Sequence, residues 1–220
     1  MKIFARGEDF REAVVQGTRD EGIHGEDGAA FAARSRSLRY AKMKFTGAML
    51  KFIAMRDYRL MWRVHQWRPP KWVRLWMVCA TRGGDGWLWG LLALAVLLIG
   101  GMEALPALAA AAAATMSGIA LFVWLKRKIR RRRPCAIHPH AWAKLLPPDK
   151  FSFPSGHTIT AFAVSLPIGM HYPPLMALLL FCATSVAVSR ILLGMHFLSD
   201  VVAGSALGSL LGYTAFKLFT

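Results

Sequence analysis

The sequence predicts an all-α protein, a multi-pass transmembrane helical bundle of about five spans, or six, with an N-terminal interfacial amphipathic segment. Of its 220 residues 55% are hydrophobic, and these are gathered into long blocks rather than spread periodically. The net charge of +16 lies mostly outside those blocks. Such apolar content excludes a disordered chain, and the three cysteines, which form no CxxC pair, argue against a disulfide scaffold or a zinc site.

The N-terminal part divides into two segments before the apolar blocks begin. Residues 1–47 are polar and basic, have no apolar signal-peptide core, and are expected to form a flexible tail. Residues 48–86 alternate tryptophans with arginines and lysines around Pro69 and Pro70, a pattern typical of amphipathic helices in the lipid headgroup region. A solvated basic face or a nucleic-acid groove is the alternative. The remaining residues, 87–220, form the predicted transmembrane domain.

Five apolar blocks follow, and a span of about 20 residues crosses a 30 Å hydrocarbon core. The second block is a full span by length, the first is short, and the third needs preceding residues to complete a helix. The blocks cover residues 87–102, 105–125, 158–170, 175–189 and 197–219.

Small residues in two blocks indicate close helix packing. Gly204, Gly208 and Gly212 recur at four-residue spacing, and Ala109–Ala114 form a run in the second block. Such residues let neighbouring helices approach closely. A soluble helical bundle is the alternative, but too few polar faces remain to cover it.

Three polar groups lie at the ends of the blocks, where charge is costly and usually functional. They are residues 126–134 after the second block, 153–158 before the third, and 189–200 between the fourth and fifth. Since the second span ends where the third starts, and the fourth returns to where the fifth leaves, all three groups are predicted to meet on one side of the membrane.

The residue types in these groups predict a pocket for a phosphate-like dianion. Lys126, Arg133 and Arg190 supply three cations, the first two being seven residues apart and on one face if the helix continues. Ser155 and Gly156 precede a helix, where free backbone N–H groups and the helix dipole favour an anion. These features match the charge and hydrogen-bonding needs of a phosphoryl group.

Two histidines and a carboxylate supply the predicted chemistry. Asp200 follows His196 by four residues, a helical spacing at which it can hydrogen-bond the ring and fix its tautomer. His157 remains as a separate imidazole. A nucleophile and a general acid of this kind indicate phosphoryl transfer through a phosphohistidine, followed by hydrolysis.

Each group also has a structural alternative. Arg127, Lys128 and Arg130–Arg132 are interpreted mainly as a topology signal. Ser155 is a normal helix-capping residue, and His196 with Asp200 would also suit a polar pair between helices. The three segments together favour the functional interpretation, because they bring complementary chemistry to one face.

The same residues resemble the three signature motifs of the type 2 phosphatidic acid phosphatases, in their bacterial integral-membrane form. Lys126-x6-Arg133-Pro134, Pro154-Ser155-Gly156-His157 and Ser189-Arg190-x5-His196-x3-Asp200 match all eleven signature positions in order. Residues 81–86 are similar to a glycine-aspartate turn common in bacterial members, and residues 1–50 fall outside the resemblance.

The resemblance implies a role for each matching residue. His196 would be the nucleophile, Asp200 its orienting partner and His157 the acid that protonates the leaving group. The phosphoryl oxygens would be held by Lys126, Arg133, Ser155, Gly156 and Arg190. The family needs no metal or other cofactor. Related vanadium haloperoxidases share the pocket but are larger soluble chains.

The expected substrate is a membrane lipid bearing a phosphate. Residues 149–157, together with the four arginines before Pro134, are similar to members that act on polyisoprenoid diphosphates, which favours a prenyl diphosphate such as undecaprenyl diphosphate. Phosphatidic acid and phosphatidylglycerophosphate are the alternatives. A non-enzymatic lipid-phosphate binding protein is the main rival in another class, although His157, His196 and Asp200 are all present. A transporter or channel lacks support from internal repeats.

The expected location is the bacterial inner membrane, with the bilayer and its lipid substrate as partners and no nucleic acid. With five spans, 27 of the 28 lysines and arginines fall on the side of the site. The positive-inside rule therefore favours a cytoplasmic site, whereas many bacterial relatives work on the periplasmic face. The oligomeric state leaves no mark in the sequence.

Overall fold

The computed structural model describes residues 48–136 and 150–220, and the predicted tail, residues 1–47, lies outside this part of the chain. The described residues are almost entirely helical, as predicted, and Phe52–Thr220 form one compact unit. The helices are α3 (Ala48–Gln66), α4 (Lys71–Gly83), α5 (Trp87–Gly100), α6 (Leu105–Ile129), α7 (Gly156–His171), α8 (Pro173–Leu192) and α9 (Leu198–Phe219), with short 3-10 turns at Gly101–Ala104 (η1) and Pro134–Ala136 (η2).

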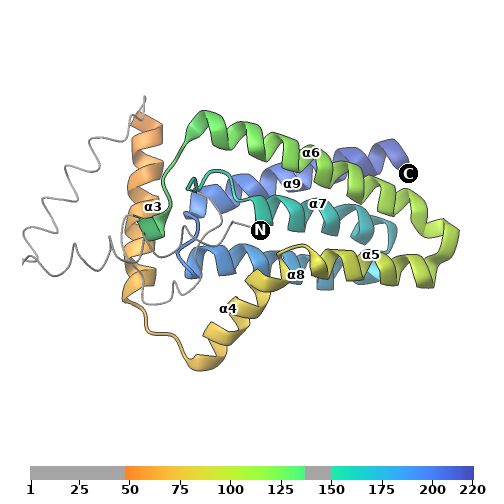
Figure 1. Cartoon of the computed structure of the whole chain (residues 1–220), viewed down its shortest axis with the longest axis horizontal. Helices are drawn as coiled ribbons and strands as arrows, with labels where there is room; N and C mark the ends of the chain where they lie inside the picture. Colours follow the sequence, from red (N-terminus) through yellow and green to blue (C-terminus); the bar gives the residue numbers. More distant parts are fainter. Residues whose placement is uncertain (1–47, 137–149) are drawn as a thin grey trace, which may run out of the picture. The chain divides into compact units, whose positions relative to one another are not determined.

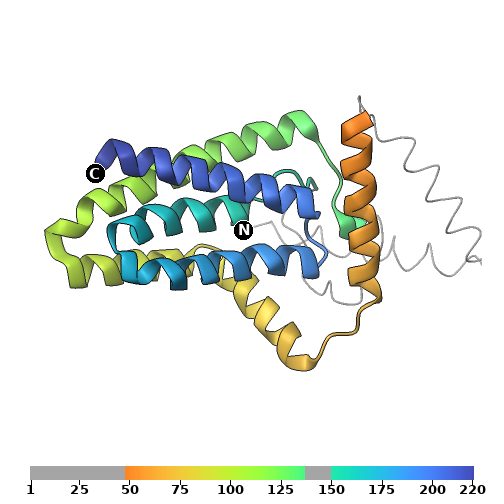
Figure 2. The ribbon, with the colours of Figure 1, turned by 180° about the vertical axis from the view of Figure 1, so that it is seen from behind.

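The five apolar blocks form α5 to α9. The run from Trp87 to Ile129, α8 and α9 are long and apolar enough to cross a membrane. At 16 residues α7 spans about 24 Å, less than the hydrocarbon thickness. It packs against α6, α8 and α9 rather than outward, and therefore forms the interior of the bundle (Figures 1 and 2).

The small residues predicted to allow close packing do line the contacts of α7. Gly204, Gly208 and Gly212 of α9 face the backbone or side chains of α7 between Ser155 and Pro167. Alanines of α6, α7 and α9 form a buried cluster beside them, made of Ala110, Ala114, Ala163 and Ala215. Side chains this small bring α6 and α9 close to the helix that begins at the polar groups.

We predict that Gly208→Ala lowers the free energy of unfolding by about 1–3 kcal/mol, the usual effect of overpacking. A methyl group there would overlap the carbonyl oxygen of Ile159, which is backbone and cannot rotate away. Gly90→Ala in α5 is the matched control, because no atom of the described residues lies within 4 Å of its added methyl group. Thermal unfolding in detergent measures both variants, and equal midpoints would contradict this packing.

The two amphipathic helices are separated at Pro69 and Pro70, as the sequence predicts, because α3 ends at Gln66 and α4 begins at Lys71. Helix α4 packs on α8, where Trp76 stacks on Phe181 with ring centroids 5.8 Å apart. Helix α3 crosses the end of the bundle at which α6 ends and α9 begins (Figures 1 and 2). It therefore reaches the end that carries the polar groups.

Candidate functional site

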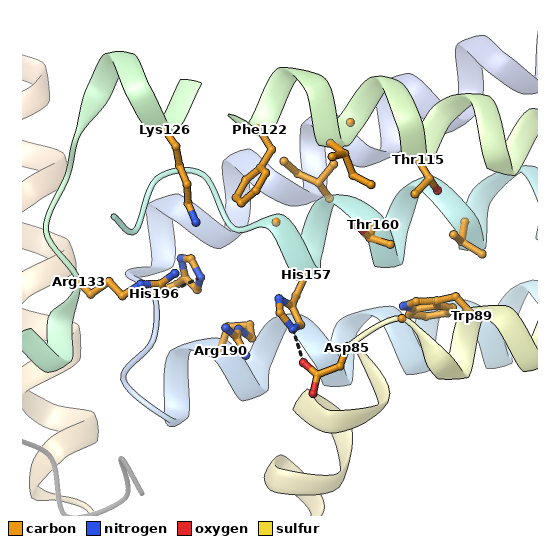
Figure 3. Close-up of a pocket in the computed structure, with 17 residues that line it drawn as sticks. Asp85, Trp89, Thr115, Phe122, Lys126, Arg133, His157, Thr160, Arg190 and His196 are labelled. Atoms are coloured by element: carbon orange, nitrogen blue, oxygen red, sulfur yellow. Dashed lines mark hydrogen bonds and ion pairs between the residues drawn. The ribbon is translucent and has the colours of Figure 1, made fainter. Parts of the chain in front are cut away.

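A cavity of about 450 Å³ opens at this end of the bundle. Each of the three polar groups contributes to its wall. The predicted residues that line it are Lys126, Arg133, Gly156, His157, Arg190 and His196 (Figure 3). Its other walls are the turn Gly84–Gly86 and an apolar surface from α5, α6 and α7 that includes Trp89, Ile119, Phe122, Ile159 and Val164. The cavity is thus polar at one end and apolar at the other.

Three buried cations come from three different segments. Arg133 donates from Nη1 to the carbonyl of Met195 at 2.9 Å, and Arg190 donates from Nη1 to the Thr81 hydroxyl at 2.5 Å. Lys126 lies in the last turn of α6 with Nζ 4.2 Å from the centroid of the Phe122 ring. Buried cations gathered around a cavity provide a site for an anion.

Lys126 and Arg133 both reach the cavity, but they do not lie on one face of a continuous helix, contrary to the prediction from the sequence. Helix α6 ends at Ile129, and Arg130 takes the left-handed conformation with φ of 50°. The chain beyond it is extended, with Arg132 bridged to Phe151. Successive side chains of an extended segment point to opposite sides, so Arg131 and Arg133 are buried whereas Arg132 is exposed.

Helix α7 begins at the cavity wall. Its first residue, Gly156, faces Phe122, whose ring would lie 2.9 Å from an added methyl group. The first N–H groups of a helix have no partners within it and point at whatever lies beyond its start. Ser155 is placed differently from the expectation: it is fully buried outside the cavity lining, and its hydroxyl lies 2.8 Å from that of Thr158.

His196 lies in the segment between α8 and α9, with its ring buried against Arg133. Arg133 Nη1 is 3.0 Å from His196 Nε2 and donates to it. Burial lowers the pKa of His196 to about 3, and the positive charges of Arg133 and Arg190 act in the same direction against the opposing effect of Asp200. The ring is therefore neutral near pH 7, with its proton on Nδ1, because Nε2 accepts from Arg133.

Asp200 is fully buried and lies beside His196. The two residues do not share a helix, contrary to the prediction from their spacing. His196 precedes α9, and Asp200 lies in the first turn of that helix, where its Oδ2 accepts from the N–H of Phe197 at 2.9 Å. The distance from His196 Nδ1 to Asp200 Oδ2 is 3.8 Å, which is too long for a hydrogen bond. The carboxylate thus faces the protonated nitrogen at a distance longer than a hydrogen bond.

One contact at the site was not predicted. His157 Nε2 lies 2.8 Å from Asp85 Oδ1, where a protonated ring nitrogen donates to the carboxylate (Figure 3). Asp85 belongs to the turn between α4 and α5. Gly84 allows the close approach, because a methyl group there would lie 3.1 Å from His157 Cδ2. The sequence signal was the glycine-aspartate turn, but nothing in it indicated which histidine Asp85 would contact.

We predict that Asp85→Asn lowers the turnover of the site about 10- to 100-fold, the loss typical when the group that orients a functional histidine is removed. The amide keeps the size of the carboxylate but not its charge. Glu103→Gln in η1 makes the same chemical change on an exposed residue outside the cavity lining and is the control. Equal turnover of both variants would show that Asp85 does not orient His157.

The chain is similar to known proteins in both sequence and structure. The model of the PAP2 superfamily matches residues 106–220. The chain is 40% identical over 94 residues to decaprenylphosphoryl-5-phosphoribose phosphatase of Mycobacterium tuberculosis, covering 42% of this chain and 50% of that protein. It is 36% identical over 98 residues to phosphatidylglycerophosphatase B of Bacillus subtilis, covering 40% and 45%. The matches thus span half or less of these curated relatives.

Two solved structures share the fold. The transmembrane PAP2 type phosphatidylglycerolphosphate phosphatase of Bacillus subtilis superposes with a TM-score of 0.61 at 26% identity, covering 82% of this chain and 90% of that one. LpxE of Aquifex aeolicus superposes with a TM-score of 0.61 at 24% identity, covering 80% and 98%. The helical fold of this chain is therefore shared with a transmembrane PAP2 type phosphatase.

Proposed function

This chain belongs to the PAP2 superfamily, and we propose on that basis that it is an integral-membrane phosphatase acting on a lipid phosphate through a phosphohistidine. The observation that carries the proposal is the cavity itself, where three buried cations and two imidazoles meet at the start of a helix. Its apolar wall fits the hydrocarbon of a substrate whose tail stays in the bilayer. The activities of the relatives named above support the same reaction class.

In the proposed first step His196 Nε2 attacks the phosphorus atom. The bond from phosphorus to the lipid-side oxygen breaks, and that oxygen takes a proton from His157. Arg133 leaves Nε2 for a phosphoryl oxygen when substrate enters. The ring, which keeps the proton on Nδ1, becomes cationic on phosphorylation, and the nearby Asp200 carboxylate stabilises this charge.

In the second step water attacks the phosphorus atom and the N–P bond breaks. His157, now neutral, accepts the proton of that water, so inorganic phosphate leaves and the enzyme returns to its starting state. Through both steps Lys126, Arg133, Arg190 and the N–H of Gly156 hold the phosphoryl oxygens. Ser155 contributes by holding the start of α7 on α9, because its N–H donates to the Asp200 carbonyl at 3.1 Å.

A prenyl diphosphate is the substrate we favour within this class. The apolar wall formed by Ile119, Phe122, Ile159 and Val164 suits a hydrocarbon chain. The relative from Mycobacterium tuberculosis, named for a decaprenylphosphoryl substrate, supports a polyprenyl tail.

A glycerolipid phosphate is the second candidate, and one observation favours it. Trp89 Nε1 and Thr115 Oγ1 both belong to residues that line the cavity, and within the described part of the chain neither atom has a hydrogen-bond partner. The ester oxygens of phosphatidic acid or phosphatidylglycerophosphate could accept from both groups, whereas a prenyl chain offers no such atoms.

The membrane placement is proposed from charge and exposure. Trp72 and Leu75 on α4 are exposed at 66% and 65%, as expected for a helix in the headgroup region. We place the site on the cytoplasmic face of the bacterial inner membrane, because the basic loop after α6 lies on the side of the cavity. A cysteine introduced at the exposed Ala136, with the three native cysteines replaced by serine, tests this. Labelling by an impermeant reagent in intact cells would contradict the cytoplasmic placement.

Phosphate release by the purified protein in detergent tests the function. The panel holds prenyl mono- and diphosphates, phosphatidic acid and phosphatidylglycerophosphate, each with EDTA present, and His196→Gln is the blank. We expect release that persists in EDTA and is fastest from the prenyl diphosphate. Faster release from the glycerolipids would favour the second candidate, and release from none would contradict the proposed reaction.

A further inference from the structure

Arg131 is a buried arginine outside the cavity lining, although it belongs to the basic run assigned to topology. Only 9% of its surface is exposed. Its Nη1 donates at 2.7 Å both to Asp200 Oδ1 and to the Ser199 hydroxyl, and its Nη2 donates at 2.7 Å to Asp57 Oδ2. The guanidinium carbon also lies 4.1 Å from the centroid of the Phe197 ring. Arg131 therefore makes specific buried contacts that its interpretation as a topology signal did not predict.

Asp57 belongs to α3, far from the signature motifs in sequence, and is 4% exposed. Its Oδ1 accepts from the N–H of Ser199 at 3.0 Å, and its Oδ2 accepts from the Ser199 hydroxyl as well as from Arg131. Two buried carboxylates, one from α3 and one from α9, thus share a single guanidinium. The planar fork of arginine suits such a bridge, whereas a lysine offers one point charge.

These contacts hold Asp200 in one orientation. Arg131 occupies its Oδ1, and the N–H of Phe197 binds its Oδ2, the oxygen that faces His196 Nδ1 at 3.8 Å. Rotation of the carboxylate would break both contacts. On the other side of the ring Arg133 binds His196 Nε2. Arg131 and Arg133 are two residues apart on the extended segment. Arg131 therefore holds the carboxylate of Asp200, and Arg133 holds the imidazole of His196.

We propose that Arg131 and Asp57 are positioning residues for Asp200, and that α3 is thereby a working part of the active site. Arg131 aims the carboxylate at His196, and Asp57 holds Arg131 and the first turn of α9 in place. The proposal rests on the phosphatase function proposed above. A purely structural role would anchor α3 and affect stability alone, so the test separates the two.

The first arm measures kcat and KM for the best substrate of the panel. Arg131→Met is expected to lower kcat about 10- to 100-fold, as loss of an outer group that orients a functional residue does, with KM changed little. Arg131→Lys is expected to retain part of kcat, since it keeps the charge but not the fork. Arg132→Met is the matched control, because that neighbouring side chain is exposed. An unchanged kcat in Arg131→Met would overturn the proposal.

The second arm repeats Arg131→Met in an Asp200→Asn background. A residue that acts through Asp200 has no further effect on kcat once that carboxylate is gone. A loss of the same size in both backgrounds would show that Arg131 acts elsewhere and would overturn the proposal. Asp57→Asn is expected to lower kcat in the same manner as Arg131→Met. An unchanged kcat would show that α3 does not contribute to the active site.

The third arm measures thermal stability, so that it tests the contact even if a variant misfolds or the proposed function is wrong. Removing Arg131 alone leaves two buried carboxylates without their cation, whereas Asp57→Asn with Arg131→Met removes one charge of each sign. The double variant is expected to melt at a higher temperature than Arg131→Met. This comparison needs no substrate, so a wild-type protein without activity would reject the proposed function but not the contact. A double variant that melts no higher would overturn the charge network itself.

Discussion

His196→Gln is expected to lower phosphate release by roughly 10⁴–10⁶-fold, the scale of loss when a nucleophile is removed from an enzyme that works through a covalent intermediate. The glutamine amide can still accept from Arg133 and fill much of the buried space. It cannot form the N–P bond, so no phosphoryl group is transferred. The protein should still fold and bind lipid phosphate, because the three cations remain.

His171→Gln provides the control for this substitution. His171 lies at the opposite end of α7 from His157 and has no part in the cavity lining. Its loss should leave phosphate release within about two-fold of wild type, because the half-buried His171 lies away from the cavity and its ring contacts Tyr172. Turnover that survives in His196→Gln would show that water, rather than His196, attacks the phosphorus atom.

Arg133→Ala is expected to lower kcat/KM by about 10²–10³-fold, as loss of a preorganised donor to a transition-state oxygen does. Two functions disappear together in this variant. The phosphoryl group loses one of its cations, and His196 loses the partner that binds Nε2 in the free enzyme. Steady-state phosphate release across substrate concentrations separates kcat from KM.

Arg132→Ala should leave kcat/KM nearly unchanged, although the two residues are adjacent and chemically identical. The side chain of Arg132 is exposed, whereas that of Arg133 is 2% exposed and reaches the cavity. Equal losses in both variants would mean that the basic run acts by its total charge. Such a result would contradict a difference in role between the exposed and the buried side chains of the extended segment after α6.

The helices and the convergence of the polar groups were predictable because they depend on local patterns and on connectivity. Apolar blocks specify where helices can lie in a membrane, and the pair Pro69 and Pro70 separates α3 from α4. The glycines of α9 indicated close packing, although not that α7 would be their partner. Counting spans then placed the three polar groups at one end, where the cavity lies.

The contacts of Arg131, Asp57 and Asp85 were not predictable in the same way. Arg131 meets Asp57 across 74 residues, and His157 meets Asp85 across 72, so no periodic pattern relates them. Within a run of arginines, the side chains that turn inward depend on where α6 ends. That end is set by the left-handed conformation of Arg130, for which the sequence offers no glycine or asparagine as a signal.

Trapping the covalent intermediate tests the central claim most directly. The purified protein is mixed with a lipid substrate carrying a labelled terminal phosphate and quenched in alkali, because the N–P bond of phosphohistidine is labile in acid. Peptide mapping then locates the label. We predict that the phosphoryl group is on His196 and is absent from the His196→Gln variant. Label on His157 instead, or rapid phosphate release with no protein-bound label at any time, would contradict the account.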